Sequence, residues 1–153
     1  MRILKENSQQ EVSLEILSFL GRLIRAISEN EANLIDIIIP TLIEVMPNHE
    51  IKYQINILEN IYLIITIFND KIKFYLDDIV QLILKYIPND NFLNIIIDIL
   101  KKLFTDFIYE MEIYYNILIP IFLNILKKNK IKETRQLLNI FLLMSENEKL
   151  FAI

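Results

Sequence analysis

The sequence contains no cysteine, one glycine, one histidine and four prolines. Without cysteine, disulfides, thiolate chemistry and the common zinc-binding frameworks are all excluded. A single glycine leaves few positions for turns that need positive φ, so a sheet with many tight hairpins is not expected. The most apolar windows, Ile61–Phe68 and Tyr114–Leu126, are shorter than the roughly 18 residues that a membrane-spanning helix requires. These absences favour a helical protein without a membrane span.

Charge and the first residues bear on partners and location. The net charge of -4 and the pI of about 5.1 give no general attraction to nucleic acid or anionic lipid. The start, MRILKENSQQ, reaches charged and amide residues before any apolar region forms, so no secretory signal is visible. We therefore expect an intracellular protein, cytoplasmic, with nuclear and peripheral endomembrane locations left open.

One motif recurs along the chain at nearly equal steps. Ile35–Pro40 (IDIIIP) is followed by Leu76–Gln81 (LDDIVQ) and then by Tyr115–Pro120 (YNILIP). A period of about 40 residues, carried by apolar segments of helical length, is typical of HEAT-type helix pairs that stack into a solenoid. The sequence therefore predicts an all-α fold: a HEAT/armadillo-type α-solenoid of about three and a half antiparallel hairpins with a right-handed superhelix.

We expect one solenoid segment over residues 1–153, with repeats at about 9–48, 49–89 and 90–129 and a partial repeat at about 130–153. Apolar periodicity and turn residues place its helices. The expected helices are about Gln9–Ser28, Asn33–Met46, Glu50–Phe68, Phe74–Ile87, Phe92–Phe107, Ile113–Lys128 and Lys132–Met144. The expected turns inside the hairpins are Glu29–Glu31, Asn69–Lys71 and Ile108–Glu112.

Proline marks the ends of two of these helices. Pro47-Asn48 and Pro88-Asn89 occupy the same place in consecutive repeats, and each should stop the preceding helix because proline cannot continue the backbone ladder. Pro40 and Pro120 fall inside helices, which they should bend.

Two apolar stripes are expected to face the core. They comprise Ile16, Leu20, Leu23, Ile24 and Ile27 in the first helix, and Ile57, Ile61, Ile64, Ile65 and Phe68 in the third. The last helix has only the beginning of a partner, Lys149–Ile153, so the array should end in mid-repeat. Apolar surface would then be exposed unless a cap covers it, which predicts a piece of a longer solenoid.

The turn sequences resemble the central HEAT region of the target-of-rapamycin (TOR) kinases, part of the PI3K-related kinases. That family carries runs such as E-F-K-P-Y-L-P-x-x-x-P, and this chain has Glu110–Pro120 (EMEIYYNILIP) and Lys71–Ile79 (KIKFYLDDI), with Tyr114 and Tyr75 at the recurring tyrosine. Leu34–Pro40 (LIDIIIP) is similar to the turn that precedes them. Several prolines frequent in the family are replaced, by Asp36, Phe74, Asp77, Ile113 and Asn116.

The resemblance covers about Glu11 to Leu150 and implies a scaffold segment that holds regulatory subunits of a large Ser/Thr kinase complex. The kinase itself is not expected here, because the Gly-rich loop, catalytic-loop and metal-binding Asp motifs of phosphoryl transfer do not occur. The degenerate motifs leave other HEAT or armadillo scaffolds open.

Few residues suggest chemistry. His49 has no companion that would make it a base or metal ligand, so a solvated surface residue is expected. Asp77 and Asp78 are adjacent near a helix start, where carboxylates favour the macrodipole. Tyr75 and the tyrosines at 114 and 115 should pack their rings at the starts of helices and keep their hydroxyls wet. We assign no catalytic, metal or cofactor-binding residue and expect no enzyme activity and no cofactor.

A basic cluster is the best candidate for a partner-binding surface. It comprises Lys127, Lys128, Lys130, Lys132 and Arg135, opposed only by Glu133. The first interpretation of such a cluster is a hydrated loop with no partner. If the cluster does bind, it lacks the interleaved aromatics that stack bases, which favours an acidic protein partner over nucleic acid.

The leading hypothesis is a non-catalytic scaffold for other protein subunits, with no small-molecule substrate. Two alternatives remain: a fragment of a full-length TOR-type kinase, and a karyopherin-like carrier or adaptor that binds a basic import signal through an acidic inner surface.

Overall fold

The computed structural model describes residues 10–27, 29–128 and 131–147. Within these ranges every regular element is an α-helix or a 3-10 helix, and no strand occurs. The prediction of an all-α fold is confirmed. The chain forms two compact units, Met1–Phe92 and Leu93–Ile153.

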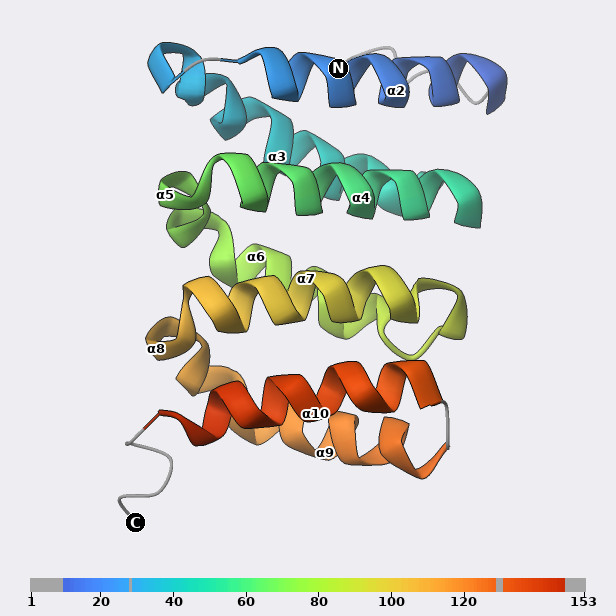
Figure 1. Cartoon of the computed structure of the whole chain (residues 1–153). Coiled ribbons are helices and arrows are strands. Elements are labelled where there is room, and N and C mark those ends of the chain that lie inside the picture. The colour runs from blue at the N-terminus through green and yellow to red at the C-terminus, as the bar shows by residue number, and fades with distance from the viewer. Residues whose placement is uncertain (1–9, 28, 129–130, 148–153) are drawn as a thin grey trace. The chain divides into compact units, whose positions relative to one another are not determined.

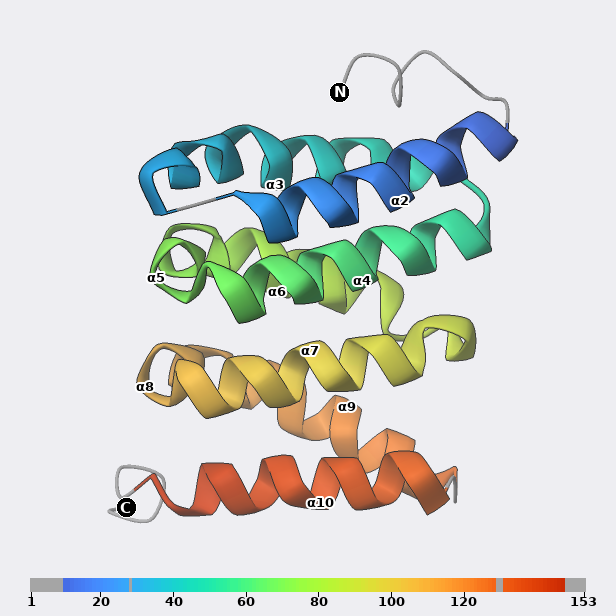
Figure 2. The ribbon, with the colours of Figure 1, turned by 45° about the horizontal axis from the view of Figure 1, so that its top comes forward.

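The first unit contains two helical hairpins. Helices α2 and α4 pack along each other, and α3, drawn behind α2 in Figures 1 and 2, also contacts α4. In chain order the elements are α2 (Gln10–Ala26), η1 (Glu29–Leu34), α3 (Ile35–Val45), η2 (Met46–Asn48), α4 (Ile51–Ile67), α5 (Asn69–Ile72), η3 (Lys73–Tyr75), α6 (Leu76–Tyr86) and η4 (Asp90–Phe92).

The second unit contains one hairpin and a further helix. Helix α10 packs against both α7 and α9, and Figure 1 shows α7 and α10 running side by side. The elements are α7 (Leu93–Asp106), α8 (Ile108–Met111), η5 (Glu112–Tyr114), α9 (Tyr115–Lys127) and α10 (Ile131–Ser145). The partner segment predicted to begin at Lys149–Ile153 lies outside the described residues.

The turn inside the hairpin has the same backbone in both units. After α4 the chain turns at Phe68 (φ -112°, ψ 46°), and after α7 it turns at Phe107 (φ -131°, ψ 41°). Each phenylalanine N–H donates to a carbonyl four residues back at 2.8 Å. A single α-helical turn and a 3-10 turn then lead into the next long helix, and every boundary of the second turn is shifted by the same interval from the first. Because φ stays negative at both corners, this turn needs no glycine, which accounts for a chain of hairpins with only one.

The predicted turns were too simple. Residues 69–71 and 108–112, expected as turns, lie in short α-helical and 3-10 turns. The first expected turn, Glu29–Glu31, is part of η1, which runs on to Leu34. The physical reason is burial: Ile72 and Met111 in these turns are fully buried, and helical turns satisfy the backbone groups that burial removes from water.

The proline stops are confirmed. Helix α3 ends at Val45 and α6 at Tyr86, each two residues before its proline, Pro47 or Pro88. The amide nitrogen Nε2 of Gln54 donates to the carbonyl of Met46 at 3.0 Å and so satisfies an end of α3. Pro40 and Pro120 lie inside α3 and α9 as expected, and the bends there stay a prediction.

The stripe predicted for α4 is confirmed, since all five of its residues are buried. The stripe predicted for α2 is partly wrong: Leu23 is exposed and Ile16 half-buried, whereas Leu17 joins the core. The buried face of α2 is therefore rotated toward Leu17, because α2 has a packed neighbour, α4, on one flank.

Candidate protein-binding surfaces

Two large apolar side chains project from equivalent turns. Phe74 in η3 and Ile113 in η5 are 80% and 75% exposed. Each is the central residue of its 3-10 turn, so the two occupy matching positions in consecutive hairpins. Exposed apolar side chains of this size are where a protein partner gains most from burial. We call this pair the turn-tip residues.

A surface hollow of about 440 Å³ adjoins Phe74 in the first unit. It is lined by Ala32, Ile67, Phe68, Asn69, Asp70, Lys71 and Phe74. Its mixed lining of apolar and polar groups is what a partner side chain with an apolar body and a polar end would fit. Sequence reasoning missed the hollow, because Ala32 comes from the turn of the first hairpin and the other lining residues come from the end of α4 and the turn of the second.

Asp36 links the two hairpins of the first unit. The Tyr75 hydroxyl donates to Asp36 Oδ1 at 2.5 Å, and the Lys71 ammonium lies 3.2 Å from Asp36 Oδ2. The carboxylate comes from α3, and its two donors come from α5 and η3. All three groups are solvent-accessible, so the cluster fixes the geometry of the turn more than it stabilises the fold.

The hydrogen bond changes both pKa values. The Tyr75 hydroxyl and then Lys71 hold the pKa of Asp36 below its usual value. The bond to Asp36, reinforced by desolvation, raises the pKa of Tyr75 to about 12. The stabilisation from Tyr75 is therefore present below its ordinary pKa of 10.0 and is lost as the pH rises through about 12. That from Asp36 is present above its ordinary pKa of 3.8 and is lost as the pH falls through its lowered pKa.

Replacing Asp36 with asparagine should lower the pKa of Tyr75 from about 12 toward 10.0, because the anionic acceptor is removed. The measurement is a pH titration of ring-labelled tyrosine by NMR. The control is Asp77→Asn, at the equivalent position of the next repeat, and it should leave the Tyr75 titration unchanged. A Tyr75 pKa that stays near 12 in Asp36→Asn would refute the assignment.

The predicted basic cluster lies at the α9–α10 connection. Lys127 ends α9 and Lys128 follows it, while Lys132 and Arg135 lie in the first turns of α10, and all four are exposed. Lys130 lies outside the described residues. Glu133 is half-buried. The structure thus brings four of the five predicted residues to one end of the second unit.

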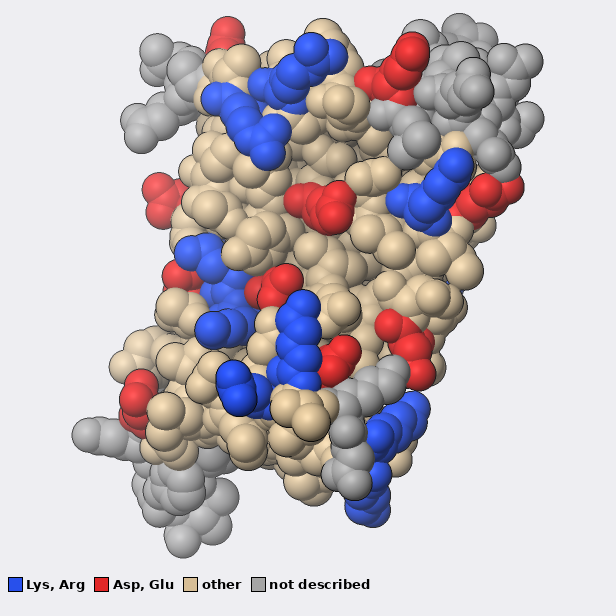
Figure 3. Space-filling view, turned by 45° about the vertical axis from the view of Figure 1, so that its right-hand side comes forward, with Lys and Arg blue, Asp and Glu red and all other residues tan. Residues whose placement is uncertain are grey.

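Charge is otherwise dispersed. Figure 3 shows acidic and basic side chains interspersed on a face that is mostly uncharged. Such a surface gives little long-range steering, so recognition depends on local contacts.

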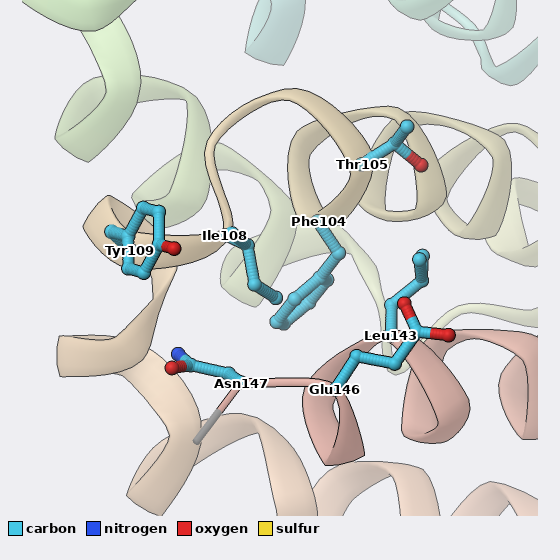
Figure 4. A pocket seen from close by; sticks show the side chains of 7 residues that line it. All are labelled: Phe104, Thr105, Ile108, Tyr109, Leu143, Glu146 and Asn147. Atoms are coloured by element: carbon cyan, nitrogen blue, oxygen red, sulfur yellow. The ribbon is translucent and has the colours of Figure 1, made fainter. Parts of the chain in front are cut away.

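A small pocket of about 230 Å³ lies where α10 ends beside α7 and α8. In Figure 4, Ile108 and Phe104 lie between Asn147 on one side and Leu143 and Glu146 on the other. The remaining lining residues are Thr105 and Tyr109.

Asn147 is the buried polar residue of this pocket. It is only 5% exposed, and its Nδ2 lies 3.5 Å from Glu112 Oε2 and 3.5 Å from the Tyr115 hydroxyl. Burial raises the pKa of Tyr115, and the bond from Asn147 partly offsets that shift. Asn147 comes one repeat after Phe107, the corner of the previous hairpin. Sequence reasoning missed Asn147 because its contacts are with residues more than 30 positions away in the chain.

Of the predictions about individual polar residues, the one for Asp77 and Asp78 is confirmed, and those for His49 and the Tyr115 hydroxyl are wrong. Asp77 and Asp78 are exposed in the first turn of α6, as expected. His49 is not fully solvated: its ring lies 6.0 Å from that of Tyr53, and its Nε2 is buried without a hydrogen-bond partner among the described residues. The Tyr115 hydroxyl is buried rather than wet, because α10 covers the start of α9.

Within the described ranges, no group of three or more His, Cys, Asp or Glu side chains is placed to hold a metal ion. No helix of that part of the chain is long and apolar enough to cross a bilayer. No family model, curated protein or solved structure matches this chain. The class of protein is therefore defined by the fold alone. It is an all-α protein built from helical hairpins.

Proposed function

We propose that this chain is a non-catalytic scaffold that binds other proteins through the exposed turns of stacked helical hairpins. The observation that carries the proposal is the repeated turn, which presents a large exposed apolar side chain, Phe74 or Ile113, at the same place in both units. The proposed architecture is a HEAT/armadillo-type solenoid with a right-handed superhelix. The constant offset between the elements of the two turns supports it.

We propose further that the scaffold is of the kind found in TOR-like kinase assemblies. The support is local. Tyr75 and Tyr114, which match the recurring tyrosine of that family, each close a 3-10 turn directly before a long helix. In that setting the chain would hold regulatory subunits, while catalysis would belong to another domain.

The test is affinity capture of partners from an extract of the source cells, using the whole chain shown to be folded by circular dichroism. We expect the wild-type chain to retain specific proteins. The double variant Phe74→Ser/Ile113→Ser should lose most of that retention because it removes the turn-tip residues while keeping the core.

The matched control is Ile37→Ser/Ile117→Ser, which also removes one exposed isoleucine from each unit, on α3 and α9. This control should retain the same proteins as the wild type. A folded wild-type chain that retains none, or equal loss in both double variants, would count against the proposal.

A further inference from the structure

Helix α10 has an exposed face that is apolar and basic at once. Ile131, Arg135, Leu138 and Leu142 fall at i, i+4, i+7 and i+11, so they form one stripe along the helix. The three aliphatic side chains are 80%, 55% and 60% exposed, and Arg135 is exposed between them. We call these four residues the α10 stripe.

The opposite side of α10 is the one that packs. Leu137, Ile140 and Met144 are buried, and Gln136 Nε2 donates to Asp98 Oδ1 of α7 at 3.0 Å. The helix is therefore held in place by α7 and α9. The α10 stripe is thus presented on a fixed support.

The charge along this face is mostly basic, and the exposed acid on it is Glu146, whose N–H donates to the Leu142 carbonyl at the far end of the stripe. Lys132 is exposed beside the stripe, and Lys127 and Lys128 are exposed at the end of α9, near the start of α10. The one acidic residue in α10, Glu133, lies about 160° around the helix from Arg135 and is half-buried. Within the described part of the chain, neither Lys132 nor Arg135 is in an ion pair.

A second copy of α10 is a poor fit for this face. Each copy carries four exposed basic residues in or beside the stripe, Lys127, Lys128, Lys132 and Arg135, against one exposed acid, Glu146, so two α10 stripes packed together would bring two net positive faces into contact. Like charges brought together in a partly buried interface disfavour association. An occupant with acidic residues beside its own apolar residues is complementary in both respects.

We infer that the α10 stripe docks an acidic amphipathic helix of a partner protein. This inference rests on the proposed scaffold function and specifies a partner for one of its faces. The partner helix places apolar residues at i, i+3 or i+4 and i+7 on the leucines and Ile131, with Glu or Asp on its flanks facing Arg135 and Lys132. The stripe spans about three turns, roughly 16 Å. An interface of this size is small, and micromolar affinity is expected.

The experiment uses the whole chain and two labelled peptides of about 18 residues that share one apolar heptad stripe and differ only on its flanks, with Glu in one and Lys in the other. Binding is measured by fluorescence anisotropy at low and high salt. We expect the Glu peptide to bind about tenfold more tightly than the Lys peptide at low salt, and the preference to shrink as salt is added.

Variants locate the site. Arg135→Glu should abolish the preference for the Glu peptide, whereas Arg22→Glu, the same charge change at an exposed position of α2, should not. Leu142→Ser should lower the affinity of the chain for both peptides. Its control is Ile37→Ser on α3, which removes an aliphatic side chain of equal exposure, 59% against 60%.

Several results would overturn the inference: equal affinities for the two peptides, no binding of the Glu peptide, or binding that Leu142→Ser leaves intact. Self-association in sedimentation that Leu142→Ser abolishes would assign the stripe to a second copy instead. If neither peptide binds but capture of proteins through the turn-tip residues persists, this inference alone is wrong. If the folded chain captures nothing, the scaffold function falls with it.

Discussion

Replacing Phe104 with alanine should lower the free energy of unfolding by about 3–5 kcal/mol, the range found when a buried phenylalanine is truncated. Phe104 is fully buried in α7, with its ring centroid 5.8 Å from that of Tyr115 and 6.3 Å from that of Phe122. Phe122 in turn meets Phe141 of α10 edge to face at 5.8 Å. Truncation would leave a cavity among α7, α9 and α10, and surrounding structure relaxes only partially around such a cavity.

The measurement is denaturant unfolding followed by circular dichroism, and the control is the same substitution at Phe74. Because Phe74 is 80% exposed, Phe74→Ala should change the free energy of unfolding by no more than about 0.5 kcal/mol. Similar losses at the two positions would contradict the packing described for the second unit.

Replacing Gly21 with leucine should destabilise the protein by about 1–3 kcal/mol through overpacking. Gly21 is buried in α2, and a Cβ placed on it would lie 3.2 Å from the Asn60 side-chain oxygen Oδ1 of α4. The Asn60 amide is held in turn, since its Nδ2 donates to the Asn56 carbonyl at 2.9 Å. The only glycine of the chain is thus used where two helices come close, and not in a turn.

Gly21→Ala should be nearly neutral. Removing a glycine from a helix favours folding by about 1 kcal/mol, and the 3.2 Å contact of the new methyl group with Asn60 opposes this gain. The control for the leucine variant is Ala26→Leu, at an exposed position of the same helix, which should be tolerated. A Gly21→Leu chain as stable as the control would show that α2 and α4 are not in close contact at this point. Thermal and denaturant unfolding both measure the difference.

The long helices were predictable because their signals are local. The apolar stripe of α4 needs only the spacing of five residues, and the ends of α3 and α6 need only Pro47 and Pro88. The predicted limits lie within a few residues of those observed, for instance Glu50–Phe68 against Ile51–Ile67. Helical periodicity and proline geometry act through neighbours in sequence, so they can be read from sequence alone.

The turns and the buried face of α2 were less predictable because they depend on what covers them. Ile72 and Met111 are ordinary apolar residues in sequence, and only their burial explains why the turns are helical. Leu23 is as hydrophobic as Leu17, yet it is exposed while Leu17 is buried. The difference comes from the side on which α4 packs.

Of the candidate binding surfaces, too, some could be predicted from the sequence and others could not. The basic cluster was visible in sequence because its members are close along the chain. The turn-tip residues were not singled out, since Phe74 and Ile113 resemble core residues until their exposure is known. The bond between Asp36 and Tyr75 joins residues 39 apart, and the contact of Asn147 with Glu112 joins residues 35 apart. No local rule pairs such residues.

The sequence by itself determined that this protein is helical, where its long helices begin and end, and that its hairpins recur at a regular interval, because periodicity and helix stops are properties of neighbouring residues. Only the tertiary structure decided which apolar residues are buried and which are exposed for partners. Burial depends on the neighbour that each helix face meets, and the residues of that neighbour lie dozens of positions away in the chain.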